Sequence, residues 1–206
     1  MLAAPTALLP LAAAGFVVAF LHAALPTHWL PFVLVSRARG WSRTRTLAVA
    51  AFAGLGHVAC TVLLGAGVLA AGMVVAPWLG HGLHWIAGGL LVALGLWQLM
   101  GHAHGGEPRR YRSDAAAMAG LFLLLAISPC EAFLPLYLAN AGEGWGAFAL
   151  LSGVLLIATT AGMMLFTGLS LAGASRLKLD WLARREPAIL GGVMCALGVA
   201  MIAVEL

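Results

Sequence analysis

Long apolar segments constrain the fold of this chain more than any other feature of its sequence. They reach the roughly 20 residues that a helix needs to cross a lipid bilayer, at about residues 8–35, 46–74, 81–100, 115–139, 146–173 and 186–205. Hydrophobic residues make up 63% of the 206 positions and charged residues only 9%, against about 25% charged in a soluble domain. The runs are too long and too uniformly apolar for barrel strands. The sequence therefore predicts an all-α integral membrane protein with six transmembrane helices.

The two halves of the chain repeat each other at an offset of 103 positions. Matching blocks are Pro26-Thr27-His28 with Pro129-Cys130-Glu131, Gly65 with Gly168, and Gly88-Gly89 with Gly191-Gly192. Self-similarity at a fixed offset indicates internal duplication, so we expect two repeats, residues 1–103 and 104–206, within one membrane domain. Each repeat has three apolar runs, and this odd number places the second repeat upside down relative to the first. Inverted repeats are typical of secondary transporters, whose sites lie at the repeat interface and use broken helices.

The basic residues predict the orientation in the membrane. All 11 Lys and Arg residues fall in the loops after the first, third and fifth runs, whereas the loops near 72–80 and 140–144 carry none. By the positive-inside rule the basic side is cytoplasmic and both termini face outward, in a multi-pass protein of a bacterial-type inner membrane. The net charge of +4 then reflects this topology and does not indicate nucleic-acid binding.

The first run carries two histidines on either side of a proline. His22 and His28 are six positions apart, and in an unbroken helix their side chains would point about 240° away from each other. Pro26 lies between them and Pro31 follows, and each removes a backbone donor and disturbs the helix. We therefore expect a broken helix that turns both imidazoles toward one cavity.

The second and fourth runs add further candidate metal ligands. His57 and Cys60 are three positions apart and share a helix face, and imidazole with thiol suits a borderline or soft metal. Glu131 is the only acid deep in any run and follows Cys130 at a proline, so a broken helix is expected here too. A buried carboxylate needs a cation, a proton or a histidine partner. The alternative to a metal role is a structural hydrogen bond between Glu131 and His28.

Other histidines and cysteines have weaker signals. His84 lies near the outer end of the third run, and His102 and His104 form a short histidine tract in the loop before the fourth run. We take these three, together with Cys60, as candidate secondary ligands. Cys195 lies in a glycine-rich packing helix and is expected in the core. The three cysteines form no CxxC motif, which gives neither a paired redox site nor a disulfide framework.

These motifs resemble those of the nickel/cobalt transporter family (NicO), particularly its efflux branch. The shared features are the H-x5-H of His22 and His28 with Pro26 between them, the second-run His57, Pro129-Cys130 at the fourth run, and a His-containing loop before it. The resemblance covers most of the chain through short motifs, and it implies a membrane transporter of nickel or cobalt. The chain departs from this pattern at Thr27, where uptake members carry Asp, and at Glu131, where another proline is expected.

A broader resemblance connects the chain with thiol-electron carriers of the cytochrome c biogenesis and disulfide-reductant type. They are similar in having six spans in inverted repeats and a Pro-Cys pair in the fourth span. Such carriers need a second cysteine in the first span, where this chain has Thr27. The absence of that cysteine argues against dithiol exchange.

Together these residues predict a proton-coupled transporter of a divalent transition metal such as Ni, Co, Zn, Cu or Fe. His28, Glu131 and Cys130 would hold the ion as substrate, and His22 and His57 would complete the site; neutral imidazole, carboxylate and thiolate all exchange metal for protons. The cytoplasmic histidine tract favours efflux. The expected partners are the lipid bilayer, metal ions and protons, without an organic cofactor, and a homo-oligomer is compatible with the sequence. Alternatives are an intramembrane thiol-redox carrier, a zinc-dependent membrane enzyme with Glu131 as general base, and a metal-free assembly protein.

Overall fold

The described part of the chain is helical throughout and contains no strand. The computed structural model describes residues 5–79, 82–100, 113–127, 130, 132–173 and 179–203. Its helices are α1 (Pro5–Ala23), α2 (Pro26–Arg39), α3 (Arg43–Leu79), α4 (Gly82–Leu99), α5 (Asp114–Ala126), α6 (Phe133–Ala139), the 3₁₀ turn η1 (Ala141–Glu143), α7 (Gly144–Leu171) and α8 (Leu179–Ala203). The prediction of an all-α protein is confirmed, and the helix bounds follow the predicted apolar runs to within a few residues, apart from α8, which begins seven positions earlier.

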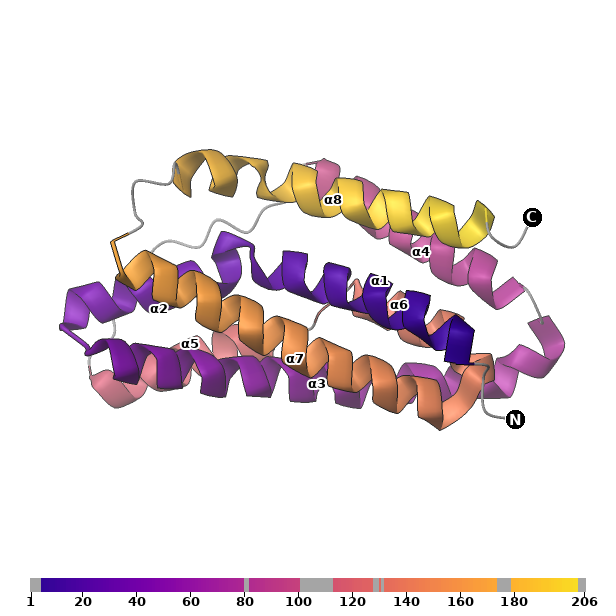
Figure 1. Ribbon diagram of the computed structural model, residues 1–206, viewed down its shortest axis with the longest axis horizontal. Coiled ribbons are helices and arrows are strands. Elements are labelled where there is room, and N and C mark those ends of the chain that lie inside the picture. Colours follow the sequence, from indigo (N-terminus) through magenta and orange to yellow (C-terminus); the bar gives the residue numbers. More distant parts are fainter. Residues whose placement is uncertain are drawn as a thin grey trace.

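The helices form an elongated bundle and run along its long axis (Figure 1). The beginning of α1 and the end of α8 lie at the same end of the bundle (Figure 1). At the centre, α7 packs against both α1 and α3, while α4 packs along α8 at the side. A Cβ atom on Gly15 would meet Leu151, and one on Gly162 would meet Ala23. Because the contact in α7 advances from Leu151 to Gly162 as α1 advances from Gly15 to Ala23, these two helices run parallel.

The first apolar run is broken where the sequence predicts a break. Leu25 adopts an extended conformation (φ −67°, ψ 140°) between α1 and α2, because the ring of Pro26 disfavours the helical region for the residue before it. Pro26 then occupies the first turn of α2, where its missing N–H costs no hydrogen bond. The carbonyl of Ala24 next to the break accepts a hydrogen bond from the buried Trp29 indole at 2.9 Å. The break is thus an ordered feature with its own hydrogen bonds.

Pro31 does not interrupt the helix, and this part of the prediction was wrong. Pro31 lies inside α2, which continues unbroken to Arg39. A proline at this position removes one hydrogen bond, to the carbonyl of Thr27 in the first helical turn. The helix accommodates the loss of this one hydrogen bond near its start. Pro26 differs because the residue before it, Leu25, is extended.

The fourth run is also interrupted. Helix α5 ends at Ala126 and α6 begins at Phe133. Within this interval Cys130 is described and fully buried, whereas Ser128, Pro129 and Glu131 lie outside the described residues. The predicted break in the fourth run is therefore observed between these two helices.

The surface of the bundle has the character expected of a membrane protein. By length and composition, three segments of the described residues are able to cross a membrane: Leu9–Arg39, Arg43–Val75 and Ala141–Leu171. Shorter apolar helices cover Trp85–Trp97, Asp114–Ala126 and Gly191–Ala203. Large apolar side chains face outward along the long helices, for example Leu63 at 75% and Ile157 at 65% exposure. Such a surface is suited to lipid and unusual for a protein surrounded by water.

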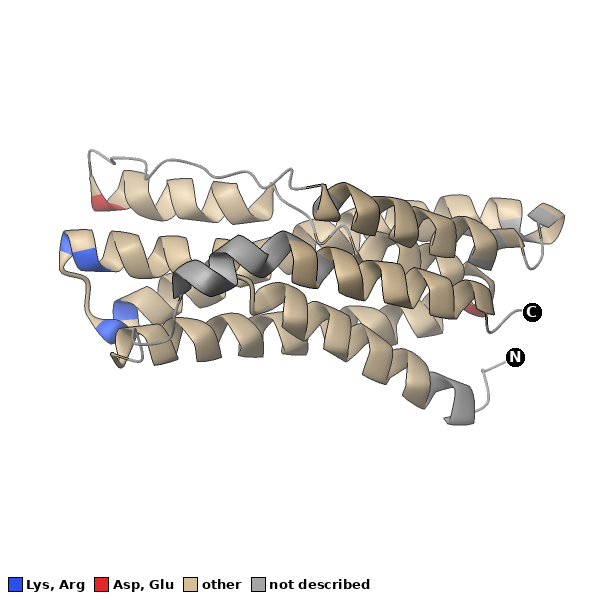
Figure 2. Ribbon diagram, turned by 90° about the horizontal axis from the view of Figure 1, so that it is seen from above, with Lys and Arg blue, Asp and Glu red and all other residues tan. Residues whose placement is uncertain are grey.

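The Lys and Arg residues that Figure 2 colours blue lie at one end of the bundle. Here Asp114, the first residue of α5, accepts hydrogen bonds from Arg39 at 2.7 Å and Arg45 at 2.8 Å. Arg37 donates to the carbonyl of Ser170 near the end of α7. These contacts join the α2–α3 connection to α5 and α7 at the same end of the molecule.

Close contacts between glycines join α4 to α8. A Cβ atom built on Gly88 would lie 2.8 Å from the carbonyl oxygen of Gly198, and one built on Gly95 would lie 2.7 Å from that of Gly191. Between these two contacts the thiol of Cys195 donates to the carbonyl of Val92 at 3.7 Å. Cys195 therefore lies in a helix contact, but it is only half-buried, so the expectation that it belongs to the core was wrong. Small residues at these positions allow the two backbones to approach closely, as in many membrane helix pairs.

Candidate metal centre

Three side chains from separate elements converge in the middle of the bundle. His22 lies in the last turn of α1, His57 in the middle of α3, and Cys130 in the interval between α5 and α6. Their potential ligand atoms all lie within 4.8 Å of one another. His57 and Cys130 have no exposed surface, and His22 is 9% exposed. We refer to His22, His57 and Cys130 as the donor triad.

His28 lies against this triad. The break at Leu25 reverses the divergence that an unbroken helix would impose, and the His22 and His28 ring centroids are only 4.3 Å apart. The His28 ring is 5.4 Å from that of His57 and nearly perpendicular to it. Its Nδ1 also lies 3.3 Å from the hydroxyl oxygen of Thr27. The expectation that a broken helix brings both histidines to one place is therefore confirmed, with His28 beside the compact triad.

The surrounding backbone fixes the tautomer of His57. Nδ1 of His57 lies 3.1 Å from the carbonyl oxygen of Leu125, in the last turn of α5. A carbonyl oxygen only accepts hydrogen bonds, so Nδ1 carries the hydrogen and, in the neutral ring, Nε2 carries the lone pair. Metal-binding histidines commonly have this second hydrogen bond, which fixes the ring and increases its basicity. Sequence reasoning missed this partner because a backbone acceptor leaves no residue-type signal.

Thr61 connects α3 to the interval that carries Cys130. Its hydroxyl donates to the carbonyl of His57 at 3.0 Å, one helical turn earlier. The same oxygen accepts a hydrogen bond from the backbone N–H of Cys130 at 3.0 Å. This buried hydroxyl therefore fixes the position of the thiol-bearing backbone relative to His57. The sequence analysis did not single out Thr61, although its position one turn after a buried histidine was a usable signal.

The triad has suitable chemistry for a transition metal ion and a geometry close to the one required. Two imidazoles and one thiol are ligands that zinc and other borderline metals accept. An ion at the centre of a triangle with 4.8 Å sides would lie about 2.8 Å from each donor, whereas zinc bonds are about 2.0–2.3 Å long. Because 4.8 Å is the upper limit of the separations, the donors need to move inward by at most about 0.5–0.8 Å to reach these bond lengths. Within the part of the chain that the structure describes, neither ring nitrogen of His22 has a hydrogen-bond partner.

The remaining predicted ligands are not part of the triad. Cys60 is half-buried on α3 and outside it, because three helical positions leave an angular offset of about 60° from His57. Glu131, His102 and His104 lie outside the described residues. His84 belongs to α4, but its side chain is also outside the described part.

Comparisons with protein-family models, with curated proteins and with solved structures gave no significant match.

Proposed function

We propose that the protein transports a divalent transition metal ion across a membrane. The observation that carries this proposal is the donor triad, which buries two imidazoles and a thiol in the centre of an apolar bundle. Polar groups in such surroundings are costly, so their presence there points to a function. The interruptions between α1 and α2 and between α5 and α6 also lie at this point, as is common at transporter binding sites.

The pairing of the helices supports an inverted repeat of three spans in each half. The offset of 103 positions relates α1 to α5, α2 to α6, α3 to α7 and α4 to α8. Contacts occur in matching pairs: α1 packs on α7 as α5 packs on α3, and α2 packs on α7 as α6 packs on α3. The pairs α3 with α7 and α4 with α8 each join a helix to its own counterpart. Two halves related by a two-fold axis would have this set of contacts.

The α4–α8 contact supports the same symmetry at the level of single residues. Adding 103 to Gly88 gives Gly191, and subtracting 103 from Gly198 gives Gly95. The close pair Gly88 and Gly198 is therefore the symmetry counterpart of the pair Gly95 and Gly191. Val92 and Cys195 are counterparts of each other and are in contact, which puts the proposed axis between them.

The proposed orientation places the basic end in the cytoplasm. The arginines that Figure 2 colours blue lie at this end, and the positive-inside rule assigns such an end to the cytoplasmic side. Both termini then face outward across a bacterial-type inner membrane.

In the proposed mechanism, the donor triad binds the ion and His28 contributes a further imidazole or accepts a proton. Histidine and cysteine bind metal in their deprotonated forms, so binding releases protons and couples transport to the proton gradient. Glu131, the residue after the buried Cys130, is our candidate for the coupling group. Nickel and cobalt are the substrates suggested by the resemblance to NicO proteins, and the His102–His104 tract favours efflux.

The experiment compares uptake of Ni²⁺, Co²⁺ and Zn²⁺ into proteoliposomes with metal bound to the purified protein. At least a tenfold loss of both bound metal and transport is expected for His22→Ala, His57→Ala and Cys130→Ser. Transport should fall by the same factor in His28→Ala and Glu131→Gln. Cys60→Ser and Cys195→Ser are matched controls, since both change a thiol outside the triad. Wild-type transport by the Cys130→Ser and His57→Ala proteins would exclude the proposed site.

A thiol-redox role is the second candidate, because Cys130 is buried at a helix interruption beside imidazoles. This role predicts a mixed disulfide between Cys130 and a partner thiol. A protein that retains Cys130 alone should trap such a species if the redox role holds. Metal transport predicts no mixed disulfide and predicts metal-dependent uptake.

A further inference from the structure

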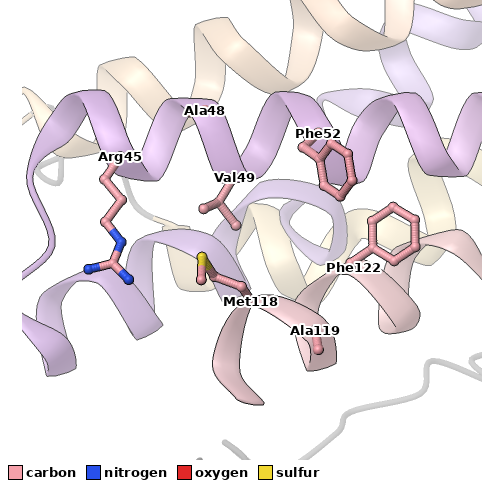
Figure 3. Close-up of a pocket in the computed structure, with 7 residues that line it drawn as sticks. All are labelled: Arg45, Ala48, Val49, Phe52, Met118, Ala119 and Phe122. Atoms are coloured by element: carbon pink, nitrogen blue, oxygen red, sulfur yellow. The ribbon is translucent and has the colours of Figure 1, made fainter. Parts of the chain in front are cut away.

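An apolar groove lies between α3 and α5, and its lining includes none of the donor-triad residues. It has a volume of about 530 Å³. Its lining residues are Arg45, Ala48, Val49 and Phe52 from α3 and Met118, Ala119 and Phe122 from α5 (Figure 3). Six of these seven side chains are apolar, and among the described lining residues only Arg45 is charged.

Aromatic rings close the groove at the end opposite Arg45. The rings of Phe52 and Phe122 are stacked with their centroids 5.0 Å apart. Phe122 also packs directly on Gly56, where a Cβ atom would overlap its ring. Between the aromatic pair and Arg45, Ala48 and Ala119 leave space that larger side chains would fill. The groove is thus a short apolar slot with a cation at one end (Figure 3).

Among the described residues, the cationic end carries more positive than negative charge. One carboxylate, that of Asp114, pairs with both Arg39 and Arg45. The Arg45 side chain remains 40% exposed, and its guanidinium lies 4.8 Å from the centre of the Trp41 ring. Arg43 is exposed nearby at the start of α3. This end can therefore attract an additional anion.

We propose that this groove binds an anionic phospholipid, with its phosphate at Arg45 and part of one acyl chain between Val49, Phe52 and Met118. A cation at the basic end of an apolar slot is complementary to an anionic head group joined to a hydrocarbon tail, and basic pockets between membrane helices commonly bind such head groups. An extended peptide would need backbone hydrogen-bond partners, which the six apolar side chains of the lining do not supply. The proposal rests on a membrane location but not on metal transport.

The occupied groove would lie close to the donor triad. Phe122 is one helical turn before Leu125, whose carbonyl bonds to His57, and Gly56 is adjacent to His57. An acyl chain against Phe52 and Phe122 would therefore support the α3–α5 contact on which the His57 ring depends. This placement gives the lipid a direct route to influence the triad.

The test is native mass spectrometry of the intact protein, purified in detergent and supplied with phosphatidylglycerol or phosphatidylcholine. The wild type should retain more phosphatidylglycerol than phosphatidylcholine. Arg45→Gln should reduce this preference about fivefold, the effect of one basic side chain near a lipid surface. Arg43→Gln is the matched control, since it removes the same charge outside the groove, and it should change the preference little. Ala119→Phe should fill the groove and lower retention of both lipids.

Three results would overturn the proposal. The first is equal loss of preference in the Arg45→Gln and Arg43→Gln proteins, which would indicate general attraction to the basic end. The second is a dimer that the Ala119→Phe substitution dissociates, since a second copy would then occupy the groove. The third is unchanged lipid retention in Ala119→Phe. Because Arg45→Gln removes an ion pair, helical content is checked by circular dichroism, and Ala119→Phe tests the proposal without changing any charge.

Discussion

Adjacent glycines on α4 allow a direct test of the close contact between α4 and α8. Gly88 faces α8, and a Cβ atom there would lie 2.7 Å from Cγ1 of Ile202 and 2.8 Å from the carbonyl oxygen of Gly198. Gly89, the next residue, has no atom within 4 Å of the corresponding position. Replacing each with alanine adds the same methyl group to the same helix, in one case at the contact and in the other facing away.

The expected difference in stability follows from these distances. Ordinary contacts begin near 3.4 Å, so Gly88→Ala must separate the helices by about 0.6 Å, and such overpacking typically costs about 1–3 kcal/mol. Gly89→Ala meets nothing and gains up to about 1 kcal/mol of helix propensity. The two variants should therefore differ by about 2 kcal/mol or more in the free energy of unfolding.

Unfolding in mixed detergent micelles, followed by circular dichroism, measures this difference. The proposed repeat adds a second requirement: Gly191→Ala should be destabilising and Gly192→Ala should not, since Gly191 also faces a carbonyl oxygen and Gly192 has open space. Equal stabilities of Gly88→Ala and Gly89→Ala would refute the close packing. The opposite order in the second repeat would refute the symmetry.

Four further predictions concern the site and the packed bundle. Thr61→Val should lower metal affinity at least tenfold by equilibrium dialysis, as loss of supporting hydrogen bonds commonly does, whereas Thr61→Ser should retain it. Thr167 is fully buried and its hydroxyl has no partner among the residues that the structure describes, so Thr167→Val should raise the free energy of unfolding by about 1 kcal/mol. Thr46→Val should lower it, because that hydroxyl bonds to Ser36 and to the carbonyl of Ser42. The hydrogen bond from Arg39 holds the pKa of Asp114 below its usual value. The ionised Asp114 carboxylate therefore stabilises the fold above the unfolded-state pKa, and this stabilisation is lost as the pH falls through the lower folded-state pKa. Melting temperatures of Asp114→Asn should consequently lack this acid-side decrease. Chelators should lower the melting temperature of metal-loaded protein, since an ion at 100 times its Kd stabilises by about 2.7 kcal/mol; an unchanged melting temperature would mean that the folded state does not bind the ion.

The sequence was sufficient to predict the helices and the first break. Apolar runs of bilayer length predict α3, α4 and α7 directly, and Pro26 predicts the break because proline restricts the residue before it. Pro31 has the same residue type but a different outcome, since α2 continues through it. Composition alone does not show whether a proline lies at the first turn of a helix or beyond it.

The site was predictable only at the level of residue types. His22, His28, His57 and Cys130 were identified as rare polar groups in apolar runs, and the structure places them together. The carbonyl of Leu125 and the bridging hydroxyl of Thr61 depend on the register of α3 against α5, which no local pattern specifies. Cys60 shows the same limit, because a 60° rotation around α3 separates a buried ligand from a half-buried thiol.

The candidate ligands are distributed unevenly between the proposed repeats, and this has a consequence for the proposed transport. The three histidines come from residues 1–103, whereas Cys130 and the carbonyl of Leu125 come from residues 104–206. If the repeats move as units during alternating access, the imidazoles travel together while the thiol leaves them, and His57 loses the hydrogen bond that fixes its tautomer. Both changes would weaken metal binding at the proposed site in the same step. The symmetric bundle would thereby permit the movement, and the asymmetric ligands would convert it into release of the ion.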